Sequence, residues 1–215
     1  MRGYVLVEGH GEVEAAANLV SRLWADLKGP FPWAAPMRWK NLAREEGLRR
    51  GAEYVRRLGD ARALLVLRDE DDRCPGNEAP KLAETLRGLA LPCPTAVVLF
   101  HPEYEVLFLP CIELMAGEPL PSPVGPRPGI VAGTTWTGDW ERLRGIKEWL
   151  SQHFPPNRAY KPVLDQLPMT RMLDLPTLRA ANLSSFTRLE RALAFLRDHD
   201  VGGVVYPSPQ AEDEE

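Results

Sequence analysis

Two groups of acidic residues each follow a short apolar segment, and together they could hold a metal ion. Glu8 comes directly after residues 4–7, and Asp69 opens an Asp-Glu-Asp-Asp run that follows residues 63–67. If each segment is a strand, period-two alternation turns Asp69 and Asp71 to the same side of the chain. Mg²⁺ and Mn²⁺ prefer hard oxygen ligands such as carboxylates. The pattern predicts a divalent-metal site whose catalytic core is Glu8, Asp69 and Asp71.

Further acidic residues extend this predicted site. Asp72 closes the acidic run, and Glu103 and Glu105 follow the apolar residues 95–100. We expect Asp72 and Glu103 to add metal ligands, because two metal ions about 3.5–4 Å apart suit the cleavage of a phosphodiester bond. The other explanation, an acid that stabilises a helix N-terminus, is stronger for Glu105 than for Glu103. Glu8 could be either a ligand or the general base that activates the attacking water.

Each acidic group has a simpler explanation when it is taken alone. Glu8 could stabilise the N-terminus of the following helix, and the acidic run that begins at Asp69 could be a solvated turn. The two groups taken together favour a metal, because both fall at the carboxyl ends of predicted core strands. Like charges gathered there would repel one another unless a cation offset them.

Four polar residues are candidates for substrate contacts. His10 and Glu12 lie in and just after the turn that follows Glu8, and His10 could contact phosphate or assist proton transfer. Lys161 and Arg171 belong to a polar group in the C-terminal part, where their charges could position a phosphate backbone. Solvated helix faces explain Lys161 and Arg171 almost as well.

The elements that would position these residues alternate along the first half of the chain. Apolar runs predict strands, and apolar residues at helical spacing predict helices between them. The expected strands cover residues 4–7, 37–42, 63–67 and 95–100, and the expected helices cover residues 12–27, 44–58 and 79–89. This alternation predicts an α/β layered, Rossmann-like fold with a mostly parallel central sheet, and such sheets bind ligands at the carboxyl ends of their strands.

The second half of the chain changes in character. Helices are expected at residues 104–115, 140–153, 175–182 and 185–197, and a proline-rich surface loop at residues 119–128. We therefore expect an α/β core over residues 1–116 and a C-terminal helical extension over residues 117–206. Residues 204–206 are a candidate strand that would return to the sheet. The acidic tail, residues 207–215, lacks apolar side chains with which to pack and is expected to be disordered.

The acidic motifs resemble those of a known family. Val7-Glu8-Gly9 and the Asp69-x-Asp71 pair resemble the signature of topoisomerase–primase (Toprim) domains, and Val-Glu-Gly-x-x-Glu over residues 7–12 is closest to the OLD-type (overcoming lysogenisation defect) nucleases. More of the chain resembles an uncharacterised bacterial family of small Toprim-like proteins. The segments that carry this wider resemblance are residues 68–75, 103–109, 160–166 and 185–189.

The resemblance implies an Mg²⁺- or Mn²⁺-dependent nuclease that cleaves the phosphodiester bonds of DNA or RNA, with Glu8, Asp69 and Asp71 at its metal site. It further implies an effector of bacterial anti-phage defence that works with a partner ATPase. The sequence has no Gly-x4-Gly-Lys-Ser/Thr loop, so ATP hydrolysis would come from a second protein. The alternative is a non-catalytic Toprim-like subunit that binds an ATPase or another protein.

Composition limits the other possibilities. The 215 residues carry a formal charge of −4, and no apolar stretch approaches the roughly 18 residues of a membrane span. The N-terminus does not resemble a signal peptide, so we expect a cytoplasmic protein without membrane contact. The three cysteines form no Cys-x-x-Cys pair and are expected to be reduced thiols.

Two features allow nucleic-acid contact without requiring it. The arginines of residues 44–57 alternate with glutamates, so we expect a salt-bridged surface, and the scattered tryptophans suit core and interface packing. Assembly into a homo-oligomer stays open at this stage.

Overall fold

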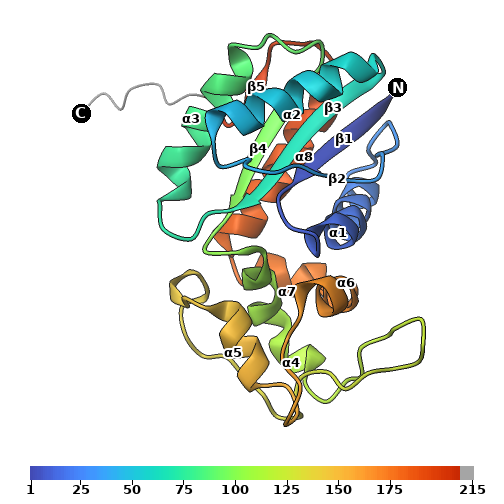
Figure 1. The fold of residues 1–215 in the computed structure, drawn as a ribbon, viewed down its shortest axis with the longest axis vertical. Helices are drawn as coiled ribbons and strands as arrows, with labels where there is room; N and C mark the ends of the chain where they lie inside the picture. Colours follow the sequence, from blue (N-terminus) through green and yellow to red (C-terminus); the bar gives the residue numbers. More distant parts are fainter. Residues whose placement is uncertain (209–215) are drawn as a thin grey trace.

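The computed structural model describes residues 1–208 and has an α/β fold around a five-stranded, all-parallel sheet (Figure 1). The sheet order is β2-β1-β3-β4-β5. The strands are β1 (Arg2–Val7), β2 (Met37–Arg38), β3 (Ala61–Asp69), β4 (Thr95–Phe100) and β5 (Val205–Tyr206). The predicted fold class, a Rossmann-like layered fold with a parallel sheet, is confirmed.

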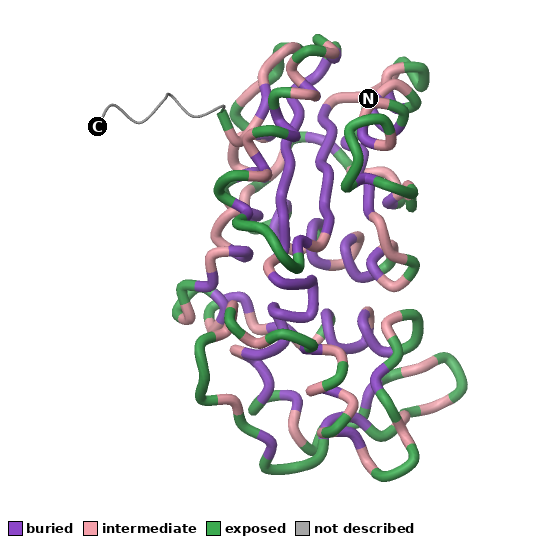
Figure 2. Tube along the Cα trace, turned by 60° about the vertical axis from the view of Figure 1, so that its left-hand side comes forward, coloured by how far each residue is buried: buried purple, intermediate pink, exposed green. Residues whose placement is uncertain are grey.

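Helices cover both faces of the sheet. The helices α1 (Glu12–Asp26) and α8 (Ser184–Asp198) pack on one face, and α2 (Glu45–Leu58) and α3 (Pro75–Arg87) pack on the other. The central strands β3 and β4 are apolar at successive positions because side chains of both faces are buried. Figure 2 shows these strands as the buried centre of the upper part of the molecule.

A second group of short elements lies beyond the carboxyl ends of the strands (Figure 1). It begins with the 3₁₀ helix η1 directly after β4, and η1 is the most buried segment of this part. The group consists of η1 (Tyr104–Cys111), α4 (Ile112–Met115), η2 (Trp140–Arg142), α5 (Ile146–Gln152), α6 (Pro162–Met172) and α7 (Leu175–Ala180). One apolar core joins these elements to the sheet through α1 and α8, so the sheet edge that carries the acids is largely covered.

The chain differs from the predicted plan in several places. The strand expected at residues 37–42 covers only Met37–Arg38. The helix expected at residues 104–115 is a 3₁₀ helix followed by one α-helical turn, and Pro110 lies at their junction. The helix expected at residues 140–153 is divided by Gly145, whose φ of 66° is left-handed. The helix α6 was not predicted at all.

The C-terminal part of the predicted extension belongs to the sheet layers. The helix α8 packs against β4, and β5 pairs with β4 in parallel through Thr95 and Val205. The segment from Ser184 to Tyr206 is therefore part of the α/β core in space, although it follows the extension in sequence. Of the tail expected to be disordered, residues 209–215 lie outside the described residues.

The remaining expectations concern thiols and membranes. The cysteines are free, with Cys74 exposed and Cys93 and Cys111 buried. Burial raises the pKa of the Cys93 thiol to about 11. No helix among residues 1–208 combines the length and the apolar character that a membrane crossing requires.

Candidate metal centre

The candidate site lies where the order of the strands reverses. From β1 the chain moves to β2 on one side and then returns to β3 on the other, so the switch point lies between the carboxyl ends of β1 and β3. Ligands of open α/β sheets bind at this place. A hollow of about 490 Å³ opens there, and its lining includes Glu8, Glu12, Asp69, Asp71 and Asp72.

The turn after β1 is held tightly against its surroundings. The Glu12 carboxylate is buried and accepts a hydrogen bond from the Glu8 backbone N–H at 3.3 Å. A Cβ atom at Gly9 would lie 2.4 Å from a Glu12 carboxylate oxygen, and one at Gly11 would lie 2.3 Å from the Gln166 side-chain oxygen of α6. At Gly11 a Cβ would also lie 2.7 Å from the Pro162 backbone, so a side chain there would collide, whereas at Gly9 the Glu12 carboxylate would have to move.

Glu12 is therefore part of the wall of the hollow rather than an exposed substrate contact. Burial raises the pKa of its carboxyl, and the hydrogen bonds from the backbone of Gly9 and Glu8 lower it in part. Its charge also acts on Asp69, whose pKa it helps to raise.

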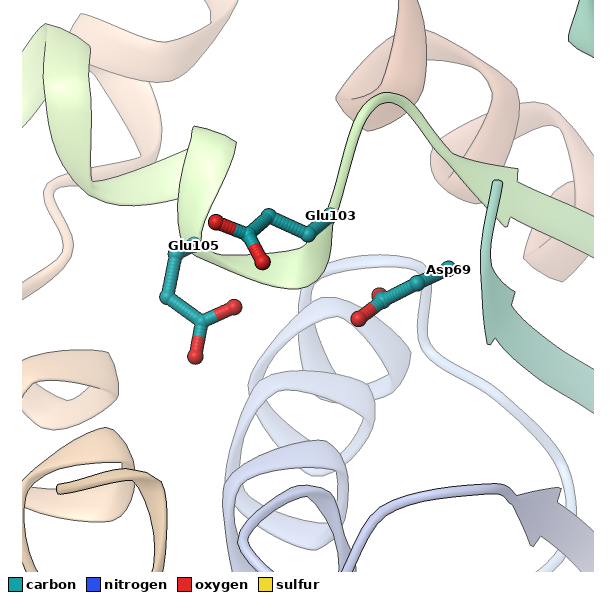
Figure 3. A group of neighbouring side chains, drawn as sticks. All are labelled: Asp69, Glu103 and Glu105. Carbon is teal, nitrogen blue, oxygen red and sulfur yellow. The ribbon is translucent and has the colours of Figure 1, made fainter. Parts of the chain in front are cut away.

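Figure 3 shows three carboxylates that converge, those of Asp69, Glu103 and Glu105. Of these, Asp69 also lines the hollow. One oxygen of each carboxylate lies within 4.8 Å of the others. Asp69 ends β3, whereas Glu103 and Glu105 come from the start of η1, which follows the neighbouring strand β4. The Tyr104 backbone N–H donates to Asp69 Oδ1 at 2.8 Å and joins the two segments. The sheet register and η1 together bring the three acids to one point.

An ammonium group lies among these carboxylates. Lys147 of α5 places Nζ 2.5 Å from Glu103 Oε2, 3.4 Å from Glu105 Oε2 and 3.7 Å from Asp69 Oδ2. Its backbone N–H also donates to Glu103 Oε1 at 3.0 Å. Burial opposes the charge of this lysine, but Glu105, Asp69 and Glu103 together raise its pKa above the ordinary value. Lys147 thus offsets part of the negative charge of the three acids, a role that the sequence analysis assigned to a metal ion.

One ammonium does not balance the whole cluster. Burial raises the pKa of Asp69 well above its usual range, and the charges of Glu12 and Glu105 raise it further. Burial raises the pKa of Glu105 to about 7, although Lys147 and the Tyr160 hydroxyl both oppose the shift. Tyr160 donates to Glu105 Oε1 at 2.8 Å, while the buried Glu105 Oε2 has no hydrogen-bond partner among the described residues.

The acidic residues after Asp69 lie in two different environments. Glu70 is buried, pairs with Arg68 at 2.5 Å and accepts from the Arg73 backbone N–H at 3.2 Å, so it anchors the loop. Asp71 and Asp72 are exposed at the rim of the hollow. Asp69 therefore meets Glu103 and Glu105 in the tight group rather than Asp71, although burial and the charge of Glu103 raise the Asp71 pKa.

The other predicted contacts are spread over the surface. His10 is exposed in the turn after Glu8. Lys161 lines a separate hollow beside Asp165, and Arg171 lines an apolar groove beside Glu14. Neither Lys161 nor Arg171 is among the residues that line the acidic hollow.

Sequence reasoning gave too little weight to Glu105 and missed Lys147. Glu105 is completely buried and is the one charged residue in the apolar run from Tyr104 to Ile112. An acid inside such a run is a signal for a buried paired carboxylate. No comparable signal marks Lys147, because its partners are more than forty residues away in sequence.

Comparisons of this chain with family models, curated proteins and solved structures found no match. What the site can bind is therefore inferred from its own side chains. The donor set is composed of carboxylate oxygens, one of them without a hydrogen-bond partner among the described residues, and it could hold a metal ion. Such a cation would have to displace the Lys147 ammonium from the centre of the group.

Proposed function

We propose that this protein is an Mg²⁺- or Mn²⁺-dependent Toprim-type nuclease that cleaves phosphodiester bonds of DNA or RNA. The observation that carries the proposal is the convergence of Asp69, Glu103 and Glu105 within 4.8 Å at the carboxyl ends of the neighbouring parallel strands β3 and β4. Buried acids are rare unless they are paired or bind metal. The open hollow is lined by Asp69, so a substrate in it would reach the cluster through this carboxylate.

Asp69, Glu103 and Glu105 would hold the cation, with Asp71 and Glu8 reaching it from the rim of the hollow. A bound divalent ion would lower the pKa of a coordinated water and offset charge on the phosphate. Glu8 is the candidate general base, because it is half-buried, directly follows β1 and lines the hollow.

Two arginines give the hollow positive charge near the acids. Arg68 is buried against Glu70, and Arg73 is exposed on the loop that follows. Both line the hollow, where a guanidinium could bind phosphate oxygens in a bidentate manner. Because six acidic residues line the same hollow and both arginines already form ion pairs, a phosphodiester would need a bound cation there as well.

The cellular role that we propose is the effector of a bacterial anti-phage defence system, with a partner ATPase as the sensor. Support comes from the resemblance of the sequence motifs to OLD-type nucleases and from the missing nucleotide-binding loop. A test is co-purification with the product of a neighbouring ATPase gene, followed by cleavage assays with both proteins present.

Cleavage is tested directly with the Asp69→Asn, Asp71→Asn double variant on labelled DNA and RNA in Mg²⁺ or Mn²⁺. We expect metal-dependent cleavage by the native protein and none by this variant. The matched control is Asp198→Asn with Asp200→Asn, a pair of exposed aspartates with the same spacing in a different part of the chain. Equal cleavage by the site variant and the native protein would refute the proposal.

A second candidate function is a non-catalytic Toprim-like subunit that binds an ATPase or another protein. The Lys147 ammonium favours it, because an ion pair already satisfies part of the acidic cluster without a metal. Calorimetric titration separates the two functions. A nuclease binds Mn²⁺ in a way that Asp69→Asn weakens, whereas a binding subunit shows no metal affinity that depends on these carboxylates.

A further inference from the structure

A basic surface begins directly beside the acidic hollow. Residues 38–57 carry seven arginines and lysines against three glutamates, a formal charge of +4 within a chain whose formal charge is −4. The segment runs from β2 across to the helix α2 on the outer face of the sheet (Figure 1). Arg38 Nε donates to the Glu8 carbonyl oxygen at 3.1 Å, so this segment is tied to the turn that carries Glu8.

Two aromatic rings lie in the middle of this surface. Trp39 and Tyr54 have ring centroids 5.4 Å apart with an interplanar angle of 37°. Tyr54 is 44% exposed and Trp39 is partly exposed. The Trp39 indole N–H donates to the Gly47 carbonyl oxygen at 2.9 Å, and a Cβ atom at Gly51 would lie 3.2 Å from the indole ring.

Glycine disfavours a helix interior, yet α2 has Gly47 and Gly51 one turn apart on the side that seats Trp39. Gly47 also lets the loop before the helix pack closely, since a Cβ atom at this position would lie 2.2 Å from the Asn41 carbonyl oxygen. The helix therefore holds the indole in one position at the surface. A fixed, partly exposed aromatic ring is a platform on which a planar group can stack.

The expected salt bridges are present, but they do not pair all of the arginines and lysines of this surface. Glu45 pairs with Arg49, Glu46 with Arg50 and Glu53 with Arg56. Lys40, Arg44 and Arg57 are exposed and make no ion pair within residues 1–208. Exposed i,i+4 pairs contribute little to stability, so a phosphate can also replace the glutamates of the first two pairs.

The basic surface is continuous with the acidic hollow. Ala43 lines the acidic hollow, and the residues around it, Asn41 and Arg44, line a second hollow together with Trp39 and Lys40. A third hollow shares Trp39 with the second and continues along α2 to Tyr54 and Arg57. A ligand lying along these three hollows would pass from the aromatic pair to the carboxylates.

We propose that this path binds single-stranded nucleic acid, with unpaired bases on Trp39 and Tyr54 and phosphates on Lys40, Arg44 and Arg57. The charge selects a polyanion, and the aromatic pair selects one with exposed planar bases. In a duplex the bases are stacked inside and cannot reach such rings. The inference names the substrate class of the proposed nuclease and depends on that function for cleavage, but not for binding.

The test measures binding in EDTA by fluorescence anisotropy of labelled oligo(dT) and oligo(U), with the corresponding duplex for comparison. We expect single strands to bind more tightly than duplex. Arg44→Ala with Arg57→Ala should reduce the slope of log K against log salt by about 1.4, which corresponds to two lost phosphate contacts. Tyr54→Ala should weaken binding about tenfold, and Trp39→Phe should remove the quenching of tryptophan fluorescence by the bound strand.

The matched control is Arg142→Ala with Arg191→Ala, two exposed arginines on other elements, which should bind like the native protein. The proposal is overturned if the Arg44, Arg57 double variant binds unchanged or if duplex binds more tightly. It is also overturned if polyglutamate competes as well as oligo(dT) and Tyr54→Ala has no effect. If the protein binds single strands but does not cleave them, the nuclease proposal is refuted and the binding proposal is retained. If it cleaves and none of these variants alters cleavage, the binding proposal is refuted and the nuclease proposal is retained.

Discussion

Replacing Lys147 by methionine tests the charge balance of the acidic cluster. Methionine keeps an unbranched apolar side chain but removes the ammonium that lies 2.5 Å from Glu103 and 3.4 Å from Glu105. The variant leaves these carboxylates and Asp69 within 4.8 Å of one another without a positive charge between them. We therefore expect a less stable protein when metal is absent.

The magnitude follows from the burial of the partners. Removal of one member of a buried ion pair costs about 3–5 kcal/mol, because the remaining charge is left uncompensated. The Lys147 side chain is 35% exposed, so solvent screens part of the loss and we expect about 2–3 kcal/mol. For a chain of this size that corresponds to a fall in Tm of roughly 5–10 °C.

Divalent metal should restore much of this stability. In the Lys147→Met variant a cation would bind the carboxylates without displacing an ammonium, and at a hundred times its Kd it stabilises by about 2.7 kcal/mol. The assay is thermal unfolding of the native and variant proteins in EDTA and in increasing Mn²⁺ or Mg²⁺. We expect a larger metal-dependent rise in Tm for the variant than for the native protein.

The control is Lys81→Met, in which the lost ammonium pairs with Glu78 at the surface and its side chain is 70% exposed. That change should cost less than about 1 kcal/mol and confer no gain from metal. A Lys147→Met variant as stable as the native protein in EDTA would refute the proposed charge balance. A destabilised variant that gains nothing from Mn²⁺ or Mg²⁺ would refute the metal site.

Three further predictions concern the residues that support the cluster and the thiols. Tyr160→Phe removes the hydroxyl that donates to Glu105 Oε1 and should lower the unfolding free energy in urea by about 1–3 kcal/mol, because a buried carboxylate loses its donor. Gly11→Ala should cost about 1–3 kcal/mol in the same assay, because its Cβ would meet Gln166 at 2.3 Å. In native protein at pH 8, Ellman's reagent should modify the exposed Cys74 rapidly and the other two thiols only after denaturation, because burial raises their pKa values.

Each of these predictions has an internal comparison. Tyr206→Phe removes a hydroxyl that makes no hydrogen bond within residues 1–208 and should leave stability almost unchanged. Gly76→Ala, in α3, places a Cβ no closer than 3.6 Å to another side chain and should stabilise slightly. If Tyr160→Phe changed stability no more than Tyr206→Phe, the hydrogen bond to Glu105 would be contradicted. If Gly11→Ala changed it no more than Gly76→Ala, the close packing at Gly11 would be contradicted. Three rapidly reacting thiols in folded protein would contradict the burial of Cys93 and Cys111.

The part of the fold that could be predicted is the part in which local pattern and burial agree. The runs at residues 63–67 and 95–100 are apolar at every position, which is typical of strands covered on both faces, and both are central in the sheet. Glu8 and Asp69 could be placed at one edge because parallel neighbours end on the same side.

The helix α6 could not be recognised from its pattern, because it begins with Pro162 and contains Pro168. Its buried side chains also include Asp165, Gln166 and Thr170, so no apolar stripe marks it. Asp165 and Thr170 have partners elsewhere in the chain: Arg158 donates to Asp165 at 2.7 Å, and the hydroxyls of Thr170 and Tyr104 lie 3.1 Å apart. A helix that is defined by such tertiary contacts leaves little local signal.

The charge balance of the acidic cluster bears on whether the cluster has a structural role or binds a metal ion. Three carboxylates, those of Asp69, Glu103 and Glu105, lie within 3.7 Å of the Lys147 ammonium. Burial raises the pKa values of Asp69, of Glu105 and of the nearby Glu12, so their charged forms are disfavoured where they lie. Apolar residues would fill a purely structural position at lower cost. A metal ion with more charge than an ammonium would offset these carboxylates more fully, and such an ion is what the proposed nuclease requires.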